Sequence, residues 1–479
     1  MLPKALPAAS EDAEEIARMQ RLFERQRLAF EAAPYPERAA RKAGLRRLID
    51  ALRRHQDDIV AAVNGDFGVR SGVETRMVEV MGPMLEARHA LSHLGRWMKP
   101  RRRSTELLFL GNRAWVSHQP KGVVGIIGTW NFPLYLTLGP LVAALAAGNR
   151  AMIKVSEFSP RCTLLLRSML AECFDEDEVA VCGGGVAAAQ AFNALPFNHL
   201  VFTGSPRVGR QVMRAAAERL TPVTLELGGK SPAILGADYP LAKAAERIMV
   251  GKLLNAGQTC IAPDYVLVPA GREQAFVEAA RAVVAKCFPD MAATPDYTAI
   301  VNDRHYQRLQ GYVTDARERG ARIEPLSTAS ADVTRRRLPP LALLDVDDGM
   351  RVMQDEIFGP LLPVLPYADL DAAIAYVNQH PRPLALYYFG NDSGPRDRVL
   401  NETVAGGVTV NDTILHIAQE ELPFGGVGPS GMGHYHGLDG FKTFSKQKAV
   451  FYQSWLNGMS LFNPPYGALF ERLTKFLIR

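Results

Sequence analysis

A cysteine and a glutamate, 34 residues apart, are the two side chains whose surroundings suggest covalent chemistry. Cys260 lies in the segment Asn255-Ala-Gly-Gln-Thr-Cys-Ile-Ala-Pro-Asp264, a loop of small and polar residues after a predicted helix. A thiolate is a competent nucleophile when it is accessible and a local field lowers its pKa. Glu226 ends an apolar strand just before Gly228-Gly229, and ligands collect at the carboxyl ends of parallel strands. Taken singly, each has an ordinary alternative, a packing cysteine and a solvated or ion-paired glutamate.

The other four cysteines are interpreted as buried packing residues: Cys162, Cys173, Cys182 and Cys287. The five cysteines are an odd number, their spacing is wide, and no C-x-x-C pair occurs. This pattern argues against a disulfide framework and against a zinc site, and a reducing cytoplasm is its natural setting. His434 and His436 have no third or fourth ligand at a useful spacing, so we expect no metal site.

The elements that would position Cys260 and Glu226 alternate between strand and helix. Strands are predicted at 123–127, 150–154, 178–182, 199–202 and 222–226, with helices between them. Such strands pair in parallel through right-handed crossovers, which predicts an α/β fold with a doubly wound sheet. After Gly228-Gly229 a second series begins, which indicates a second α/β lobe: strand 232–235, helix 240–253, strand 265–268 and helix 271–286.

The two ends of the chain are predicted as helices, and a hairpin lies before the first strand. Helical periodicity recurs at 13–32, 37–55 and 73–97. Leu107 to His118, with Gly111-Asn112 at its middle, is typical of a β-hairpin. The C-terminal residues form an amphipathic helix, with Leu469, Phe470, Leu473, Phe476 and Leu477 opposite Glu471, Arg472, Lys475 and Arg479. We expect it to pack on the protein itself or on a partner subunit, with interfacial membrane attachment as the alternative.

Bulk properties exclude several classes of protein. The chain has 479 residues, of which 47% are hydrophobic, so a globular protein of two or three lobes is expected. Net charge is only +5, and the basic run 99–103 lacks the aromatic spacing of a nucleic-acid platform, so we interpret it as a solvated linker. The N-terminus resembles neither a signal nor a transit peptide. The uncharged run 122–149 is interrupted by prolines and predicts a strand, a turn and a buried helix over about 135–147 rather than a transmembrane segment.

Two glycine-rich loops could be taken for nucleotide-binding motifs. Gly204 to Gly209 follows a strand and opens a helix, so its backbone amides could face an anion. Arg210 and Gln211 follow where a phosphate loop requires Lys and Ser or Thr, which excludes a nucleoside triphosphatase. The G-x-G-x-x-G of residues 426–431 has no strand leading into it and contains a proline, so we interpret it as an irregular loop near the site.

Together, the glutamate and cysteine segments resemble the aldehyde dehydrogenase superfamily, which has these motifs in this order and at about this separation. Five further segments, all in family order between about residues 120 and 445, extend the resemblance: Gly128-Thr-Trp-Asn-Phe-Pro133, Lys154-Val-Ser-Glu157, Phe202-Thr-Gly-Ser205, Glu356-Ile-Phe-Gly-Pro360 and Pro423-Phe-Gly-Gly426. Details around 260–265, 410–417 and 431–437 are similar to the class 3 branch. Within it, the segments 97–103 and 464–467 resemble the coniferyl aldehyde dehydrogenases. Val155 and Leu254 depart from the branch at positions beside its motifs.

The resemblance implies a mechanism. The Cys260 thiolate would attack an aldehyde, with the Asn131 side chain and the Cys260 backbone N–H binding the oxyanion. After hydride loss to the cofactor, Glu226 would activate the water that hydrolyses the thioester. The alternatives are a dehydrogenase that acylates coenzyme A and a non-catalytic protein that keeps the fold.

The resemblance also implies the binding residues. Cofactor contacts would come from Thr129, Trp130, Lys154, Glu157, Gly204, Ser205, Gly209, Leu227, Gly228, Glu356 and Phe358. Because the Glu157 carboxylate suits a free ribose 2′-hydroxyl, NAD is the expected cofactor, with NADP as the alternative. Phe132, Tyr135 and Ile417 would line a pocket for an aromatic, coniferyl-type or medium-chain aldehyde.

The same resemblance implies a domain organisation and a homodimer. Residues 1–104 and 119–227 would form the NAD(P)-binding domain and residues 228–425 the catalytic domain. The hairpin segment 105–118 and the segment 426–479 would be oligomerisation elements, with the hairpin crossing between subunits.

Overall fold

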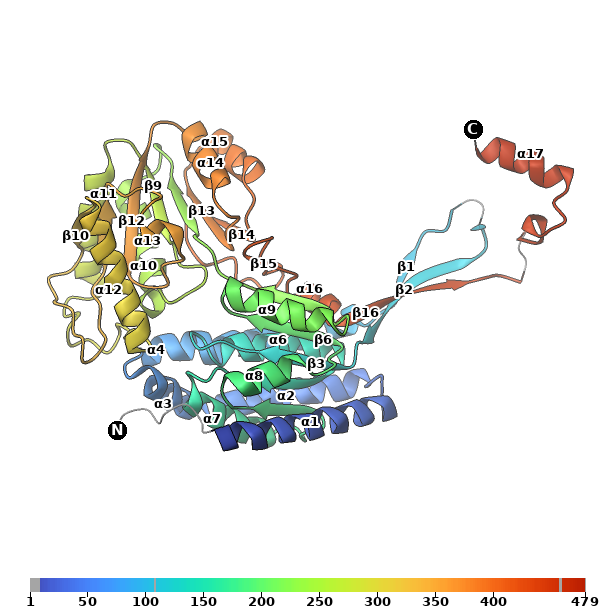
Figure 1. Cartoon of the computed structure of the whole chain (residues 1–479). Helices are drawn as coiled ribbons and strands as arrows, with labels where there is room; N and C mark the ends of the chain where they lie inside the picture. The colour runs from blue at the N-terminus through green and yellow to red at the C-terminus, as the bar shows by residue number, and fades with distance from the viewer. Residues whose placement is uncertain (1–8, 107–108, 456–458, 479) are drawn as a thin grey trace.

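The computed structural model describes residues 9–106, 109–455 and 459–478, which form two α/β lobes and a projecting arm (Figure 1). Each lobe is built on a largely parallel sheet, and the arm carries a third, antiparallel sheet. Of the helices described, none has the length and apolar character that crossing a membrane requires.

The first sheet has the strand order β15-β7-β6-β3-β4-β5. Its strands are β3 (Val123–Ile127), β4 (Arg150–Lys154), β5 (Val179–Cys182), β6 (His199–Thr203), β7 (Val223–Glu226) and β15 (Gly431–Met432). All are parallel except β15, which runs antiparallel to β7. The predicted doubly wound fold is therefore confirmed, and the five predicted strands agree with the structure within a residue at each end.

The helices of this lobe are α1 (Ala9–Ala32), α2 (Arg38–Arg54), α3 (Gln56–Phe67), α4 (Gly72–Thr75), α5 (Gly82–Trp97), α6 (Tyr135–Ala147), α7 (Pro160–Ala171), α8 (Val186–Asn193), α9 (Pro206–Ala217) and α16 (Gly437–Thr443). Every residue of α6 is buried. The apolar run 122–149 is thus a core strand and a core helix, because protein rather than lipid covers its side chains.

The helical pattern of 73–97 conceals an irregularity. Between α4 and α5 the chain makes a π-helical turn, η1 (Arg76–Met81), which contains the buried residue Glu79. Such turns insert a residue into a helix and are frequent at functional sites. Here the turn brings the Glu79 carboxylate to the backbone N–H groups of Leu134 and Tyr135, at the start of α6.

The second sheet has the order β10-β11-β12-β9-β8-β13-β14 and is parallel except for β10. Its strands are β8 (Pro232–Leu235), β9 (Tyr265–Pro269), β10 (Arg322–Pro325), β11 (Leu341–Leu344), β12 (Leu361–Tyr367), β13 (Ala385–Phe389) and β14 (Gly407–Val410). Its helices are α10 (Leu241–Leu253), α11 (Glu273–Cys287), α12 (Asp303–Glu318), α13 (Arg351–Gln354), α14 (Leu370–Gln379) and α15 (Ser393–Glu402). The four elements predicted after Gly229 all occur.

The arm is a three-stranded antiparallel sheet of β1 (Arg101–Arg103), β2 (Arg113–Pro120) and β16 (Ser445–Tyr452). Helices η4 (Met459–Phe462) and α17 (Ala468–Leu477) follow β16 at its far end (Figure 1). The expected hairpin is present, but its first strand was placed wrongly. Residues 101–103 of the basic run pair with β2, Arg102 opposite Trp115, so this part of the run is a strand rather than a linker, with Arg101 half-buried and Arg102 and Arg103 exposed. Residues 107–108 lie outside the described residues.

Candidate active site

A tight turn between the two sheets presents Cys260. After α10 the chain forms a short 3₁₀ segment, η3 (Leu254–Gly257), in which Asn255, Ala256 and Gly257 have φ values of 52°, 51° and 77°. These left-handed conformations are unfavourable for residues with a β-carbon. At Gly257 a β-carbon would lie 2.3 Å from the Gly359 carbonyl oxygen, so only glycine fits. The strained turn fixes where the following loop, and hence Cys260, must lie.

Side-chain amides hold this turn in place. The Asn255 Nδ2 donates to the Asn131 carbonyl at 3.1 Å and to the Gln258 carbonyl at 3.0 Å. The Gln258 Nε2 donates to the Asn255 and Ala299 carbonyls, both at 3.0 Å. All three amide residues are buried, so these bonds are shielded from competing water.

Asn131 lies on the loop between β3 and α6, where it reaches the cysteine loop. Its Nδ2 donates to the Gln258 carbonyl at 3.2 Å, two residues before Cys260. An amide nitrogen carries two hydrogens, so one remains to donate to a substrate oxygen. Within the described residues its Oδ1 is buried without a hydrogen-bond partner. The expected oxyanion donor is therefore held beside the cysteine loop.

Glu226 is the last residue of β7 and is buried, with 3% of the residue exposed. Both carboxylate oxygens lack a hydrogen-bond partner among the residues the structure describes. Burial raises its pKa well above the ordinary value of 4.5. The 426–431 loop lies against it, because Gly431 pairs with Glu226 and the Leu227 N–H donates to the Ser430 carbonyl. A carboxylate so isolated is available to a water or a substrate group.

Cys260 differs from the other cysteines in its surroundings. It is partly exposed, whereas Cys162, Cys173 and Cys182 are buried as expected. The expectation for Cys287 was wrong, because this residue ends the surface helix α11 and is exposed. Burial is the main effect that raises the pKa of the Cys260 thiol, and the charges of Glu356 and Glu226 raise it further. Hydrogen bonds from the backbone N–H groups of Cys260 and Ile261 lower it in part. In the free protein the thiol is therefore protonated at neutral pH and needs a base.

At the ribose end of the expected cofactor site, Lys154 is the last residue of β4 and Glu157 follows three residues later. The buried Lys154 Nζ donates to the carbonyls of Val155 at 2.8 Å and Gly184 at 2.9 Å. An ammonium group has three hydrogens, so one remains for a ligand. Burial lowers the pKa of Lys154, and the Glu157 charge opposes this.

The expected phosphate cradle is the junction of β6 and α9. Ser205 caps α9 through its hydroxyl, which accepts from the Val208 N–H at 3.5 Å. A β-carbon on Gly204 would lie 2.5 Å from the Phe202 ring, and one on Gly209 would lie 2.7 Å from the buried Leu227 side chain. Both glycines let the helix N-terminus stand close to the sheet, which suits a pyrophosphate.

The nicotinamide end combines residues of both lobes. The Trp130 ring contacts the Phe358 ring edge-on, with centroids 5.4 Å apart, and partly exposed Thr129 precedes Trp130. Glu356 accepts from the Gly229 N–H, and burial raises its pKa to about 8. A β-carbon on Gly228 would lie 2.0 Å from the Glu356 carboxylate. The buried Glu356 Oε1 has no partner within the described chain, which fits a ligand hydroxyl. The residues present thus fit a dinucleotide.

The expected substrate-pocket residues meet in one apolar cluster. Phe132, Tyr135 and Leu136 form its buried part, with Val78 and Ile417 packed against it. The Tyr135 hydroxyl contributes a polar contact to the Glu86 carboxylate. Aromatic surface with one polar end is suited to a phenolic or other aromatic molecule.

His436 has acidic neighbours that its sequence position does not reveal. Its ligand atoms and those of Glu86 and Glu420 all lie within 4.8 Å of one another. The His436 Nε2 is 3.3 Å from the Glu86 Oε1. Burial lowers the pKa of His436 to about 3 and raises that of Glu86, which favours a neutral imidazole–carboxyl contact.

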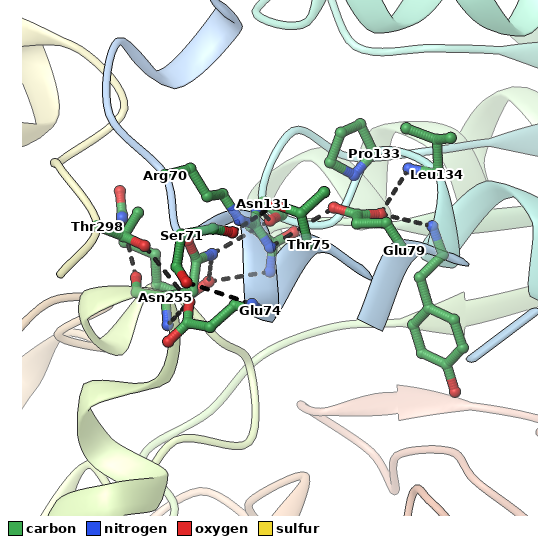
Figure 2. Close-up of polar contacts among 12 residues, drawn as sticks. Arg70, Ser71, Glu74, Thr75, Glu79, Asn131, Pro133, Leu134, Asn255 and Thr298 are labelled. Atoms are coloured by element: carbon green, nitrogen blue, oxygen red, sulfur yellow. Dashed lines mark hydrogen bonds and ion pairs between the residues drawn. The ribbon is translucent and has the colours of Figure 1, made fainter. Parts of the chain in front are cut away.

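Sequence reasoning missed the residues behind Asn131 and the cysteine loop. Figure 2 shows Arg70, Glu74 and Glu79 converging on Asn131, Asn255 and the start of α6. A local pattern could not identify them, since isolated arginines and glutamates in helical segments are ordinarily solvated. The π-helical turn is the feature that would have identified Glu79 as a candidate, and the sequence does not reveal this turn either.

Comparisons with known proteins agree with this geometry. The model of the aldehyde dehydrogenase family matches residues 7–450. The chain is 54% identical to a probable coniferyl aldehyde dehydrogenase of Pseudomonas aeruginosa, over 97% of this chain and 98% of that protein. It is 44% identical to the coniferyl aldehyde dehydrogenase of a Pseudomonas strain, over 91% and 92%.

Solved structures show the same likeness. A substrate-bound Staphylococcus aureus AldH superposes with a TM-score of 0.91 at 36% identity, covering 96% of this chain and 99% of that chain. A Mycobacterium tuberculosis aldehyde dehydrogenase complexed with NAD+ gives 0.82 at 28% identity, covering 91% and 90%. The chain therefore belongs to the aldehyde dehydrogenase family, and it is an enzyme that oxidises an aldehyde to the carboxylic acid with a nicotinamide cofactor.

Proposed function

We propose that Cys260 is the nucleophile, Asn131 the oxyanion donor and Glu226 the general base of this oxidation. The observation that carries the proposal is the buried Glu226 carboxyl group, neither of whose oxygens has a hydrogen-bond partner among the described residues. A structural role would leave such a carboxylate hydrogen-bonded or ion-paired. Its isolation is what a group that activates water requires.

The residues act in sequence. The Cys260 thiol passes its proton to a water molecule at this partly exposed site and its sulfur bonds to the aldehyde carbon, while the oxygen takes up negative charge opposite the Asn131 amide. A nicotinamide held near Glu356 and Phe358 would supply the hydride acceptor, and loss of the hydride from the adduct would leave an acyl thioester on Cys260. Glu226 takes a proton from water, the hydroxide bonds to the acyl carbon, and the carbon–sulfur bond breaks to release the acid and the thiolate.

We propose an aromatic aldehyde of the coniferyl type as substrate and NAD as the preferred cofactor. The names of the two relatives and the aromatic cluster of Phe132 and Tyr135 support the first proposal. Glu157 supports the second, because a carboxylate repels a 2′-phosphate. An initial-rate panel of coniferyl aldehyde, benzaldehyde, hexanal and a long-chain aldehyde, with NAD and with NADP, tests both. A kcat/KM that is highest for the long-chain aldehyde, or with NADP, would overturn the respective proposal.

The same assay tests hydrolysis of the thioester. We expect many turnovers with NAD and aldehyde alone, since Glu226 supplies the base for water. An absolute requirement for coenzyme A would overturn the hydrolytic mechanism.

We further propose that the arm joins two copies of the chain. Its end exposes large apolar side chains, including Trp455, 92% exposed, and Phe476, 76% exposed. Exposed aromatic residues at this density are typical of an interface. Sedimentation equilibrium of the full chain is expected to give twice the monomer mass, and a monomeric mass at micromolar concentration would refute the dimer.

A further inference from the structure

We propose that Arg70 is a positioning residue that holds the oxyanion donor Asn131 opposite the cysteine loop. The inference rests on the proposed role of Asn131. Arg70 would not touch the substrate, because its guanidinium binds the backbone of Asn131 from behind.

The first observation is the contact itself. Arg70 lies in the short connection between α3 and α4, and its side chain is completely buried. Its Nη1 donates to the Asn131 carbonyl at 2.6 Å, as drawn in Figure 2. The guanidinium carbon lies 4.8 Å from the Phe67 ring centroid and 4.7 Å from that of Phe132. A charged donor held between two rings fixes this carbonyl more firmly than a neutral donor would.

The second observation is that Glu79 binds the backbone three and four residues after Asn131. Its Oε2 accepts from the Leu134 N–H at 2.9 Å and from the Tyr135 N–H at 2.8 Å. Its Oε1 lies 3.5 Å from the Arg70 Nη2, and both side chains are fully buried. The ion pair therefore holds the segment that carries Asn131 at both ends, and the π-helical turn places Glu79 where it can do so.

The third observation is a link to the nucleophile loop. Asn255 donates to the same Asn131 carbonyl from the opposite lobe. Glu74, four residues after Arg70, accepts from the Asn255 N–H at 3.1 Å and from the Thr298 hydroxyl at 3.4 Å. The Asn131 carbonyl is thus shared by the cofactor lobe and by the loop that ends in Cys260. A change at Arg70 would alter the distance between the oxyanion donor and the sulfur.

Stability alone does not explain the pair. A buried ion pair often stabilises a fold no better than apolar side chains of similar volume. The Arg70 Nε and Nη2 and the Glu79 Oε1 have no hydrogen-bond partner among the described residues, so the geometry is not the best for mutual pairing. It is the geometry that reaches the Asn131 carbonyl and the start of α6.

The test compares Arg70→Met and Arg70→Lys with Asn131→Ala in the full-length enzyme. Rapid mixing with NAD and aldehyde measures the rate constant of acylation as the NADH burst. We expect Asn131→Ala to lower it by about 100-fold. Arg70→Met should lower it by about 10- to 100-fold, with aldehyde KM and NAD affinity changed by less than about threefold. Arg70→Lys, which keeps a charged donor, should recover most of the loss.

Arg41→Met is the matched control. Arg41 is also a buried arginine that binds carbonyl groups of this region, those of Ala146 and Ala147 at the far end of α6. Its loss should destabilise the fold to a similar extent and leave acylation within about threefold of wild type. Equal losses of acylation in Arg41→Met and Arg70→Met would overturn the inference, because a general destabilisation would then explain both.

A double variant separates the two proposals. If Arg70 acts through Asn131, the double variant Arg70→Met/Asn131→Ala should acylate no more slowly than Asn131→Ala. If the two fold-losses in the acylation rate instead multiply, the inference about Arg70 is overturned and the proposed role of Asn131 is not. Unchanged acylation in Asn131→Ala overturns the proposed role of Asn131 and the inference with it. Should Arg70→Met not fold, Glu79→Gln replaces it in the test, and we expect a similar loss in the acylation rate. The glutamine oxygen can still accept from the N–H groups at the start of α6, but it lacks the charge that orients Arg70. Wild-type acylation in Glu79→Gln would then refute the inference.

Discussion

Glu226→Gln should make the enzyme more stable while it stops turnover. Glu226 is buried and both its oxygens are unpartnered in the described structure, so an amide of the same shape loses no hydrogen bond. Burial raises the folded-state pKa of Glu226 well above the unfolded value of 4.5. The folded protein therefore holds a proton that the unfolded chain releases, and stability is lost as pH rises above 4.5.

The magnitude follows from the pH difference. Holding that proton costs about 1.4 kcal/mol for each pH unit above 4.5, until the folded-state pKa is reached. At pH 7, about 2.5 units above 4.5, this cost is at most about 3.5 kcal/mol, and relaxation of the site reduces it. Glutamine does not titrate, so Glu226→Gln should match wild type within about 1 kcal/mol near pH 4.5 and exceed it by about 1 to 3 kcal/mol at pH 7.

Urea unfolding of both proteins between pH 4.5 and 8 measures this difference, and rapid mixing with NAD and aldehyde measures the chemistry. Acylation does not need the base for water, so the variant should still give a burst of about one NADH per site. Steady-state turnover should then fall by about 100- to 10 000-fold. A stability difference that does not change with pH would refute the buried, proton-holding carboxyl. Wild-type turnover would refute Glu226 as the base.

Three further outcomes are expected. Cys260→Ala should abolish aldehyde oxidation and leave NAD binding, measured by fluorescence titration, within about twofold; residual turnover above about 1% would contradict covalent catalysis. Gly228→Ala should raise the NAD KM at least tenfold, because the new methyl group would overlap the Glu356 carboxylate in the free protein; an unchanged KM would separate Glu356 from cofactor binding. Alkylation of Cys260 in the free enzyme should accelerate up to pH 10 without a plateau, because burial and the charges of Glu356 and Glu226 raise the pKa of the thiol. A plateau below pH 8 would contradict this electrostatic picture.

The sequence predicted most of the scaffold because the relevant signals are local. Apolar runs of four or five residues between glycines and helical stretches indicated β3 to β9, and these strands occur as predicted. Motif order also placed Cys260, Glu226 and Asn131 together in the candidate site, and the structure brings Asn131 to the cysteine loop. These inferences succeed because the chemistry requires particular side chains at the ends of particular strands.

The arm shows where local signals fail. Gly111-Asn112 indicated a turn, but turn chemistry does not determine how far along the chain the pairing extends. Arg101 to Arg103 form a strand because β2, already paired with β16, offers its free edge to them. The charges of the run suggested a solvated linker rather than a strand, and Arg102 and Arg103 are exposed although they are paired. The prediction that Cys287 is buried was wrong for a related reason, because its helix lies at the surface and the cysteine is exposed.

What the sequence by itself determined is the set of reacting groups and the two lobes that carry them. The tertiary structure decided how those groups are held. Arg70 and Asn131 are 61 positions apart, and Glu74 and Asn255 are 181 apart, so no local periodicity records either contact. A buried arginine or glutamate looks like a surface residue until the fold removes water from it and supplies its partner. Burial turns these common side chains into fixed supports, and burial is a property of the whole chain.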